Sequence, residues 1–296
     1  MTLLALLGSI ELGLIYAVMA LGVFISFRTL NTPDLTVDGS FVLGAAVSAV
    51  ICSSGGSPFA ALLVAFVFGS LAGTVTSLLN TKLGIQPLLS GILVMLALYS
   101  VNLRVMGGRA NIHLMNSPSI FNLWQVAYFA KNAKLITATL TIFIILILLY
   151  FFLQTRLGFA LRATGDNETM VRAAGINSDV TKLIGLALSN GLVAVSGAMI
   201  AQYQSYADVG MGLGMVVMGL ASVIIGEVVF GVKPLLRRLL AVVLGSVLYR
   251  LIIAFAFAMG MPANDLKLVS AIIVAIALST GTLKSAVLKQ KRHLQS

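Results

Sequence analysis

The chain has 296 residues, of which 59% are hydrophobic and only 9% are charged. A soluble domain carries about 25% charged residues, so this composition excludes a water-soluble fold. The net charge of +10 does not indicate nucleic-acid binding, because the basic residues lie in short segments between apolar blocks, as is usual in membrane proteins. We therefore expect membrane lipid around the chain and no nucleic-acid partner. The single cysteine, Cys52, excludes an intrachain disulfide, and we expect no metal site.

Nine apolar blocks follow one another, at about 3–27, 37–52, 58–79, 88–105, 135–153, 183–202, 212–230, 239–259 and 268–283. Most approach the ~20 residues with which a helix crosses a bilayer. None alternates in polarity as the strands of a membrane barrel do. The sequence predicts an all-α fold, a polytopic transmembrane helical bundle of about eight to ten segments forming one domain over residues 1–296.

Two of these blocks are unusual. Block 37–52 is short, so we expect it to be a plain span or else a broken, tilted or re-entrant one. Block 212–230 is rich in glycine, which favours either close helix packing or an unwound stretch. The first block is too long for the core of a signal peptide, so we expect a retained helix.

The basic residues predict the orientation. With the C-terminus inside, most Lys and Arg of the connecting segments fall on the cytoplasmic side. We expect a multi-pass protein of the bacterial plasma (inner) membrane, with the N-terminus outside and the C-terminus in the cytoplasm. Two connections are long. The outer one, 106–134, carries Trp124 in a mildly apolar patch, where we expect a short interfacial helix. The other, 154–182, is cytoplasmic.

The cytoplasmic loop has the signals of a short helix over residues 167–174. Asp166 suits the N-cap, and Glu168 suits the positive end of the helix dipole. Gly175 suits a left-handed C-cap. The apolar side chains of this helix stand among charged neighbours and have no core of their own. Two interpretations stand at this point: the helix docks into a groove of a partner protein, or it lies on the lipid headgroups.

The stretch Arg-Leu-Gly-Phe-Ala-Leu-Arg-Ala at 156–163, followed by Ala-Gly-Ile-Asn at 174–177, resembles the coupling loop of ABC importer permeases of the branched-chain amino acid and ribose type. Segments 13–22, 27–31, 197–202 and 219–226 resemble helices of the same family. The resemblance implies a type II-like ABC importer permease whose short cytoplasmic helix docks into an ATPase. It assigns this coupling role to Arg162, Asp166, Asn167, Glu168, Met170, Val171, Arg172, Ala173, Ala174 and Gly175.

Segment 32–39 departs from the branched-chain pattern, because it lacks the His-Gly pair that follows the first loop's Asn in those permeases. It looks more like the subgroup described as tryptophan or tyrosine transporters. The resemblance therefore implies a permease for amino acids or a related small solute. Its implied partners are separate ABC ATPase subunits, an extracytoplasmic substrate-binding protein and a second permease copy in a homodimer.

The resemblance also places ATP and Mg on the ATPase subunits, with no cofactor on this chain. In agreement, the sequence has no Gly-x-x-x-x-Gly-Lys-[Ser/Thr] phosphate loop and no paired catalytic residues, so we do not expect an enzyme. The alternative is a stand-alone secondary transporter that uses the intramembrane charges Glu11, Glu227 and Arg250.

Such charges usually face protein or water. They would form a polar pathway or proton relay, or else pair structurally, for instance Glu11 with Arg250. At the first cytoplasmic loop, near Asp34, we expect Thr36 or Asp38 to cap the next helix. The candidates for lining a substrate pathway are Asn102, Ser189, Asn190, Gln202, Met215 and Met218. For the uncharged polar residues among these, hydrogen bonding between helices is the competing interpretation, and for the methionines it is packing.

Overall fold

The computed structural model describes residues 3–115, 117–122 and 132–261, together with residues 268, 271, 272 and 275. Within this part of the chain, eight helices are long and apolar enough to cross a membrane. They coincide with the first eight apolar blocks and confirm the all-α polytopic bundle. The ninth block lies mostly outside the described residues, as do the expected interfacial helix around Trp124 and the basic C-terminal segment.

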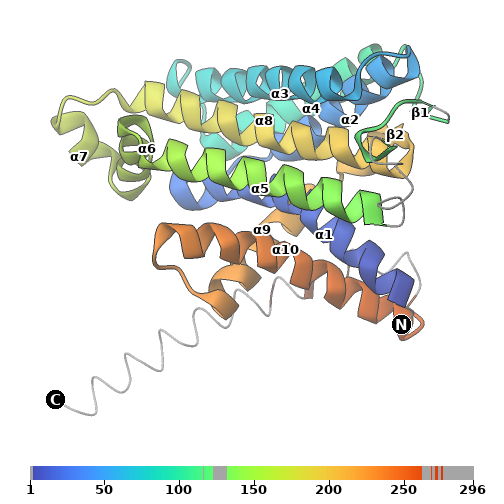
Figure 1. Cartoon of the computed structure of the whole chain (residues 1–296). Coiled ribbons are helices and arrows are strands. Elements are labelled where there is room, and N and C mark those ends of the chain that lie inside the picture. The colour runs from blue at the N-terminus through green and yellow to red at the C-terminus, as the bar shows by residue number, and fades with distance from the viewer. Residues whose placement is uncertain are drawn as a thin grey trace, which may run out of the picture.

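The long helices run roughly side by side (Figure 1). They are α1 (Leu3–Val23, continued by the π-helical segment Phe24–Thr29), α2 (Thr36–Ser53), α3 (Pro58–Thr81), α4 (Pro87–Val105), α5 (Ala133–Gln154), α8 (Ser178–Gln204), α9 (Met215–Phe230) and α10 (Leu235–Ala258). Pro58 and Pro87 occupy the first turn of α3 and α4, where a missing N–H costs nothing.

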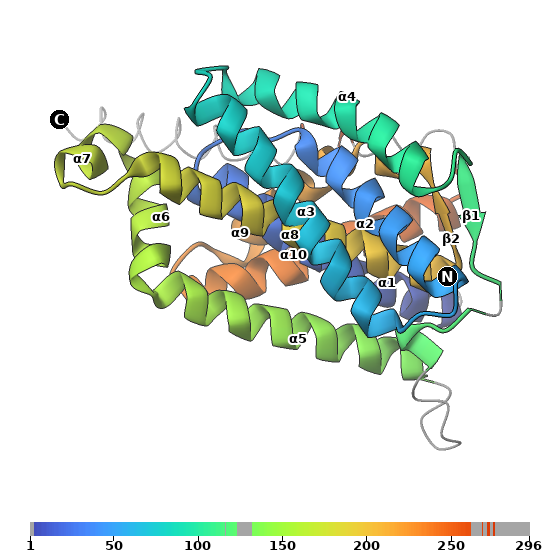
Figure 2. The same ribbon diagram turned by 90° about the horizontal axis from the view of Figure 1, so that it is seen from above.

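The two ends of the bundle differ (Figures 1 and 2). At one end lie the short helices α6 (Arg156–Asp166) and α7 (Glu168–Ala173). At the other end, strands β1 (Asn111–His113) and β2 (Tyr206–Asp208) form a two-stranded antiparallel sheet. Two 3-10 segments, Ile120–Asn122 and Val209–Gly212, also lie in the described part. The expected topology makes the α6–α7 end cytoplasmic, and we use that name for it below.

Helices α1, α2 and α8 are the most buried, and α3, α4 and α5 are the most exposed. Small residues let the buried helices approach closely, as expected where lipid supplies no hydrophobic drive between helices. A Cβ atom added at Gly44 of α2 would collide with the backbone of Ala194 in α8. One added at Gly197 of α8 would collide with the Phe41 carbonyl oxygen of α2. The core therefore depends on backbone-to-backbone contact between these helices.

Helices α2 and α9 begin inside the bundle, not at its ends. After α1, residues 30–35 turn back until Asp34 bonds Asn190, near the middle of α8. After α8 and β2, residues 209–214 return in the same way, and α9 begins beside Asp38 of α2. Block 37–52 is thus one continuous helix. Block 212–230 begins unwound and then packs closely along α9, so both features expected of its glycines are present.

The two return segments belong to two similar units of opposite direction. Helices α1 and α8 run antiparallel, because Ser189 bonds the carbonyl of Gly22 whereas Ser196 bonds that of Ile15. The succession α1, return segment, α2, α3 is repeated as α8, return segment, α9, α10. Inverted repeats of this kind place broken helices near the middle of the membrane in many transporters.

Candidate functional site

Helices α6 and α7 form a compact unit beyond the cytoplasmic ends of the spans (Figure 1). Helix α6, which was not predicted, begins where the Thr155 hydroxyl accepts a hydrogen bond from the Gly158 amide at 3.2 Å. Asp166 ends α6, so the predicted N-cap of the next helix was wrong by one residue. Asn167 is the cap of α7, and its side-chain oxygen accepts from the Met170 amide at 3.0 Å. Gly175 has φ +81°, which confirms the left-handed C-cap.

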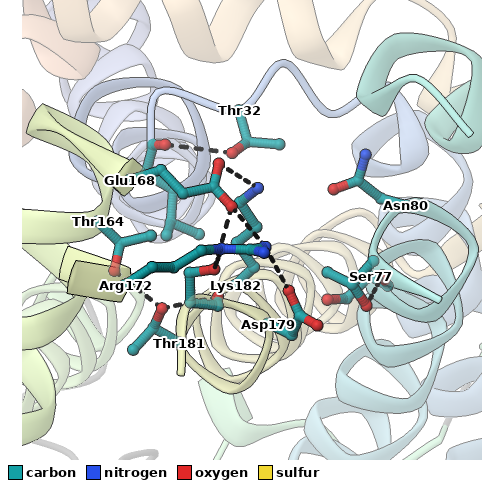
Figure 3. A network of polar contacts seen from close by, with 12 residues as sticks. Thr32, Ser77, Asn80, Thr164, Glu168, Arg172, Asp179, Thr181 and Lys182 are labelled. Carbon is teal, nitrogen blue, oxygen red and sulfur yellow. Dashed lines mark hydrogen bonds and ion pairs between the residues drawn. The ribbon is translucent and has the colours of Figure 1, made fainter. Parts of the chain in front are cut away.

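A network of charged side chains ties α7 to the start of α8 (Figure 3). Oε1 of Glu168 accepts from Arg172 and from the Ser178 hydroxyl, both at 3.0 Å, and Oε2 accepts from Lys182 at 2.7 Å. Arg172 also donates to Asp179 at 2.9 Å. The bond from Lys182, aided by Arg172, lowers the pKa of Glu168 below its ordinary value. Exposed ion pairs add about 1 kcal/mol or less each, so the network mainly fixes how α7 is oriented.

The apolar side chains of α7 divide between the bundle and the outside. Val171 is buried, whereas Met170 is 71% exposed. Beyond α7, Ile176 and Val180 are also exposed, at the same end of the molecule. Ala173 and Ala174 lie on the exposed surface as well. A short helix of fixed orientation thus presents apolar side chains away from the bundle.

A second polar cluster lies at the start of α2, in the interior of the bundle. Oδ1 of Asp34 accepts from the Thr36 amide at 2.8 Å, so Asp34 caps α2, in place of the expected Thr36 or Asp38. Asn190 donates to Oδ2 of Asp34 at 2.6 Å and accepts from the Ser40 hydroxyl at 2.7 Å. The predicted pathway residue Asn190 therefore connects α8 to the return segment before α2.

Asp38 bonds a different helix from the one expected. Its Oδ1 accepts from the Val216 amide at 2.8 Å, and its Oδ2 accepts from the Gly214 amide at 3.0 Å. Asp38 of α2 thereby caps α9, where a carboxylate also meets the positive end of the helix dipole. A cavity of about 140 Å³ adjoins this point and is lined by Asp38, Tyr99 and Asn102, among others.

The remaining pathway candidates contact neighbouring helices. Asn102 donates to the Gly39 carbonyl at 3.2 Å, and its own oxygen is buried without a partner among the described residues. Ser189 donates to the Gly22 carbonyl at 2.7 Å. Gln202 connects α8 to Ser48 and Pro58 and accepts from Ile120, and it also lines a cavity at the outer end. Met215 and Met218 pack against the core. A role of these residues in a pathway stays a prediction.

The suggested pairing of Glu11 with Arg250 was wrong. Glu11 accepts from the Tyr203 hydroxyl at 2.7 Å. The guanidinium carbon of Arg250 lies 4.0 Å from the centre of the Tyr16 ring. Helices α1 and α10, which carry Glu11 and Arg250, do pack together. Each charge nevertheless contacts a tyrosine: Glu11 contacts Tyr203 of α8, and Arg250 contacts Tyr16 of α1.

The third intramembrane charge, Glu227, is structurally paired at the cytoplasmic end of α9. Its carboxylate is buried and forms ion pairs with Arg28 and Arg238. The pairing connects three helices, α1, α9 and α10. Among the described residues, no group of three or more His, Cys, Asp or Glu side chains could hold a metal ion.

Fold and site together define a multi-pass α-helical membrane protein with two segments that return into the bundle and a unit of two short helices at one end. Residues 5–278 match the family described as branched-chain amino acid transport system / permease component. The chain belongs to this family and is an ABC transporter permease.

Two sequence relatives agree with this assignment. The chain is 42% identical to a tyrosine transport system permease protein of Clostridioides difficile, over 95% of this chain and 92% of that one. It is 26% identical to a ribose import permease protein of Escherichia coli, over 71% and 65% of the two chains. A solved ABC transporter in an inward-facing conformation shares 17% identity with a TM-score of 0.49, covering 95% of this chain and 85% of that one.

Proposed function

We propose that this permease forms the substrate pathway of an ABC importer and is coupled to a separate ATPase through α6 and α7. The observation that carries the proposal is the exposed Met170 on a helix whose orientation is fixed by Glu168. A helix of fixed orientation that presents an apolar side chain is suited to a groove, since little backbone freedom remains to be lost on docking. The ATPase would hold ATP and Mg, and the C-terminus of the permease would be cytoplasmic.

We propose an amino acid or a related small solute as substrate. The support is the 42% identity to a permease described by its tyrosine transport. An extracytoplasmic binding protein would deliver the substrate, and two copies of the permease would enclose the pathway. Uptake of tyrosine into proteoliposomes that hold the complete transporter, compared with uptake of leucine and ribose, tests this assignment.

Stand-alone secondary transport is the competing hypothesis, and the partners of the charges favour coupling over it. Glu227 is neutralised by two arginines, and Glu11 holds a tyrosine hydroxyl. An ion relay through either carboxylate would first have to displace these partners. In a transporter that works without a cytoplasmic partner, the apolar surface of α7 would have only the lipid headgroups to contact.

The coupling is tested with Met170→Glu, and the matched control is Met115→Glu at the opposite end, where Met115 is 82% exposed. Each variant is tagged and purified from membranes that contain the ATPase, and the co-purified ATPase is quantified. Burying a methionine contributes about 1.5–3 kcal/mol, so a charge at position 170 should weaken association at least about tenfold. Equal recovery of ATPase with both variants would refute docking through α7.

A further inference from the structure

A third cavity lies at the cytoplasmic end, and two of the predicted coupling residues, Arg162 and Asp166, are among its lining residues. It has a volume of about 480 Å³ and lies between the end of α1, helix α6 and the turn from α9 to α10. Arg28, Arg162, Lys233 and Arg238 line it together with the aromatic rings of Phe24 and Phe159. A cavity of this size accommodates a headgroup-sized ligand.

The cavity carries a net positive charge. Its four cations face two carboxylates, since Asp166 lines the cavity and Glu227 pairs with Arg28 and Arg238. Two positive charges are therefore left without a carboxylate. An anion is the ligand that this balance favours.

Two of the arginines are held in place before any ligand arrives. The guanidinium carbon of Arg162 lies 4.5 Å from the centre of the Phe159 ring, and one terminal nitrogen donates to the Leu153 carbonyl at 3.2 Å. Its Nε is buried and has no hydrogen-bond partner among the described residues. Arg238 lies 5.0 Å above the Phe24 ring. Planar guanidinium groups in fixed positions are well suited to the oxygens of a phosphate group.

The position of the cavity relative to the membrane indicates which kind of anion it binds. The α1 span ends at Thr29 and the α10 span begins at Leu235, so the cavity lies where the chain leaves the hydrocarbon region. Lining residues Phe159 and Val232 are 59% and 49% exposed. Apolar side chains beside a cationic cavity, at the level of the headgroups, match an acidic phospholipid with its acyl chain against the protein.

We propose that this cavity binds the phosphate headgroup of an acidic phospholipid of the cytoplasmic leaflet. The headgroup lies between Arg162 of α6 and Arg238 of α10, with Lys233 at the rim. Such a lipid would brace α6, and with it the attached α7, against the ends of α1 and α10.

The experiment uses the purified permease in neutral detergent micelles doped with phosphatidylglycerol or with phosphatidylcholine, and bound lipid is quantified by native mass spectrometry. The test variant is Arg162→Gln with Lys233→Gln. The control variant, Arg104→Gln with Arg109→Gln, removes the same charge from exposed positions at the outer end. Each Lys or Arg near an anionic headgroup contributes about a fivefold factor, so the test variant should bind phosphatidylglycerol about thirtyfold more weakly. The exposed Lys233→Gln alone, which leaves the packed arginines intact, should weaken it about fivefold.

Selective binding of phosphatidylglycerol that the test variant loses and the control keeps would support the proposal. Equal binding of both lipids, or unchanged binding by Lys233→Gln and by the double test variant, would overturn it. Complete displacement of phosphatidylglycerol by millimolar inorganic phosphate would identify free phosphate as the preferred ligand and overturn the lipid site. Loss of ATPase co-purification in the test variant without any change in bound lipid would assign the cavity to the ATPase contact and overturn the lipid site.

Discussion

Replacing Asp38 by alanine should detach α9 from α2 at the centre of the bundle. The carboxylate accepts the Gly214 and Val216 amides at 3.0 and 2.8 Å, and no residue of α9 itself caps the helix with a side chain. A hydrogen bond to a charged group contributes about 1.5–3 kcal/mol, and the amide of the buried Val216 would be left without a partner. We expect Asp38→Ala to lower the free energy of unfolding by about 2–5 kcal/mol. Asp38→Asn, which keeps one acceptor oxygen, should lose about half as much.

The matched control is Asp208→Ala. Asp208 also accepts a backbone amide, from Gly210 at 2.7 Å, but it does so within one short turn at the outer end. Unfolding by SDS titration measures the free energy, and hydrogen exchange of the α9 amides locates the change. Equal destabilisation by the two alanine variants, or exchange that rises evenly along the chain and not at the start of α9, would refute the reasoning.

Two further predictions concern the close packing of α2 and α8 and the network beneath α7. Gly197→Ala should lower the free energy of unfolding by about 2 kcal/mol or more, because the added Cβ collides with the Phe41 carbonyl. Gly8→Ala is the control and should be nearly neutral, because nothing lies within 4 Å of its added Cβ. Equal SDS-titration midpoints for the two variants would contradict this prediction. Folding lowers the pKa of Glu168, so the ionised carboxylate stabilises α7 fully above the ordinary pKa of 4.5. This stabilisation is lost as the pH falls through the lower pKa of the folded state. Hydrogen exchange of α7, corrected for intrinsic rates, should show this pH dependence in the wild type and in Asp166→Asn but not in Glu168→Gln, and its persistence in Glu168→Gln would contradict the assignment.

The positions of the spans follow from the sequence because hydropathy is a local property. Blocks 58–79 and 88–105 coincide with α3 and α4 to within a few residues, and the prolines at their starts explain where the helices begin. The same locality explains the small error at α7. Asp and Asn are equally good N-caps, and here they are neighbours, so only the backbone conformation distinguishes Asp166 from Asn167.

Helix α6 was not predicted, although its sequence carries a signal. Thr155 is a good N-cap, and the buried positions Gly158, Leu161 and Thr164 recur every three residues, as on one face of a helix. Two of these three residues are small or polar, so the pattern is weak by hydropathy. In a chain that is otherwise strongly apolar, an amphipathic helix outside the membrane is easily taken for a connecting loop.

The contacts of Asp34 with Asn190 and of Asp38 with the start of α9 could not be predicted from the sequence, for a different physical reason. Asp38 stands 178 positions before the amide of Val216 that it binds, and Asn190 is separated from Asp34 by 156. From the local sequence we expected Thr36 or Asp38 to cap the next helix, but the Asp34 side chain caps it and Asp38 caps α9. The partner of Asp38 is set by how far the segment before α9 returns into the bundle, where Gly212 lies directly against the α2 backbone. Hydropathy therefore locates the spans of this protein. The close contact of Gly212 with α2, which hydropathy does not reveal, determines that the Asp38 carboxylate binds the start of α9.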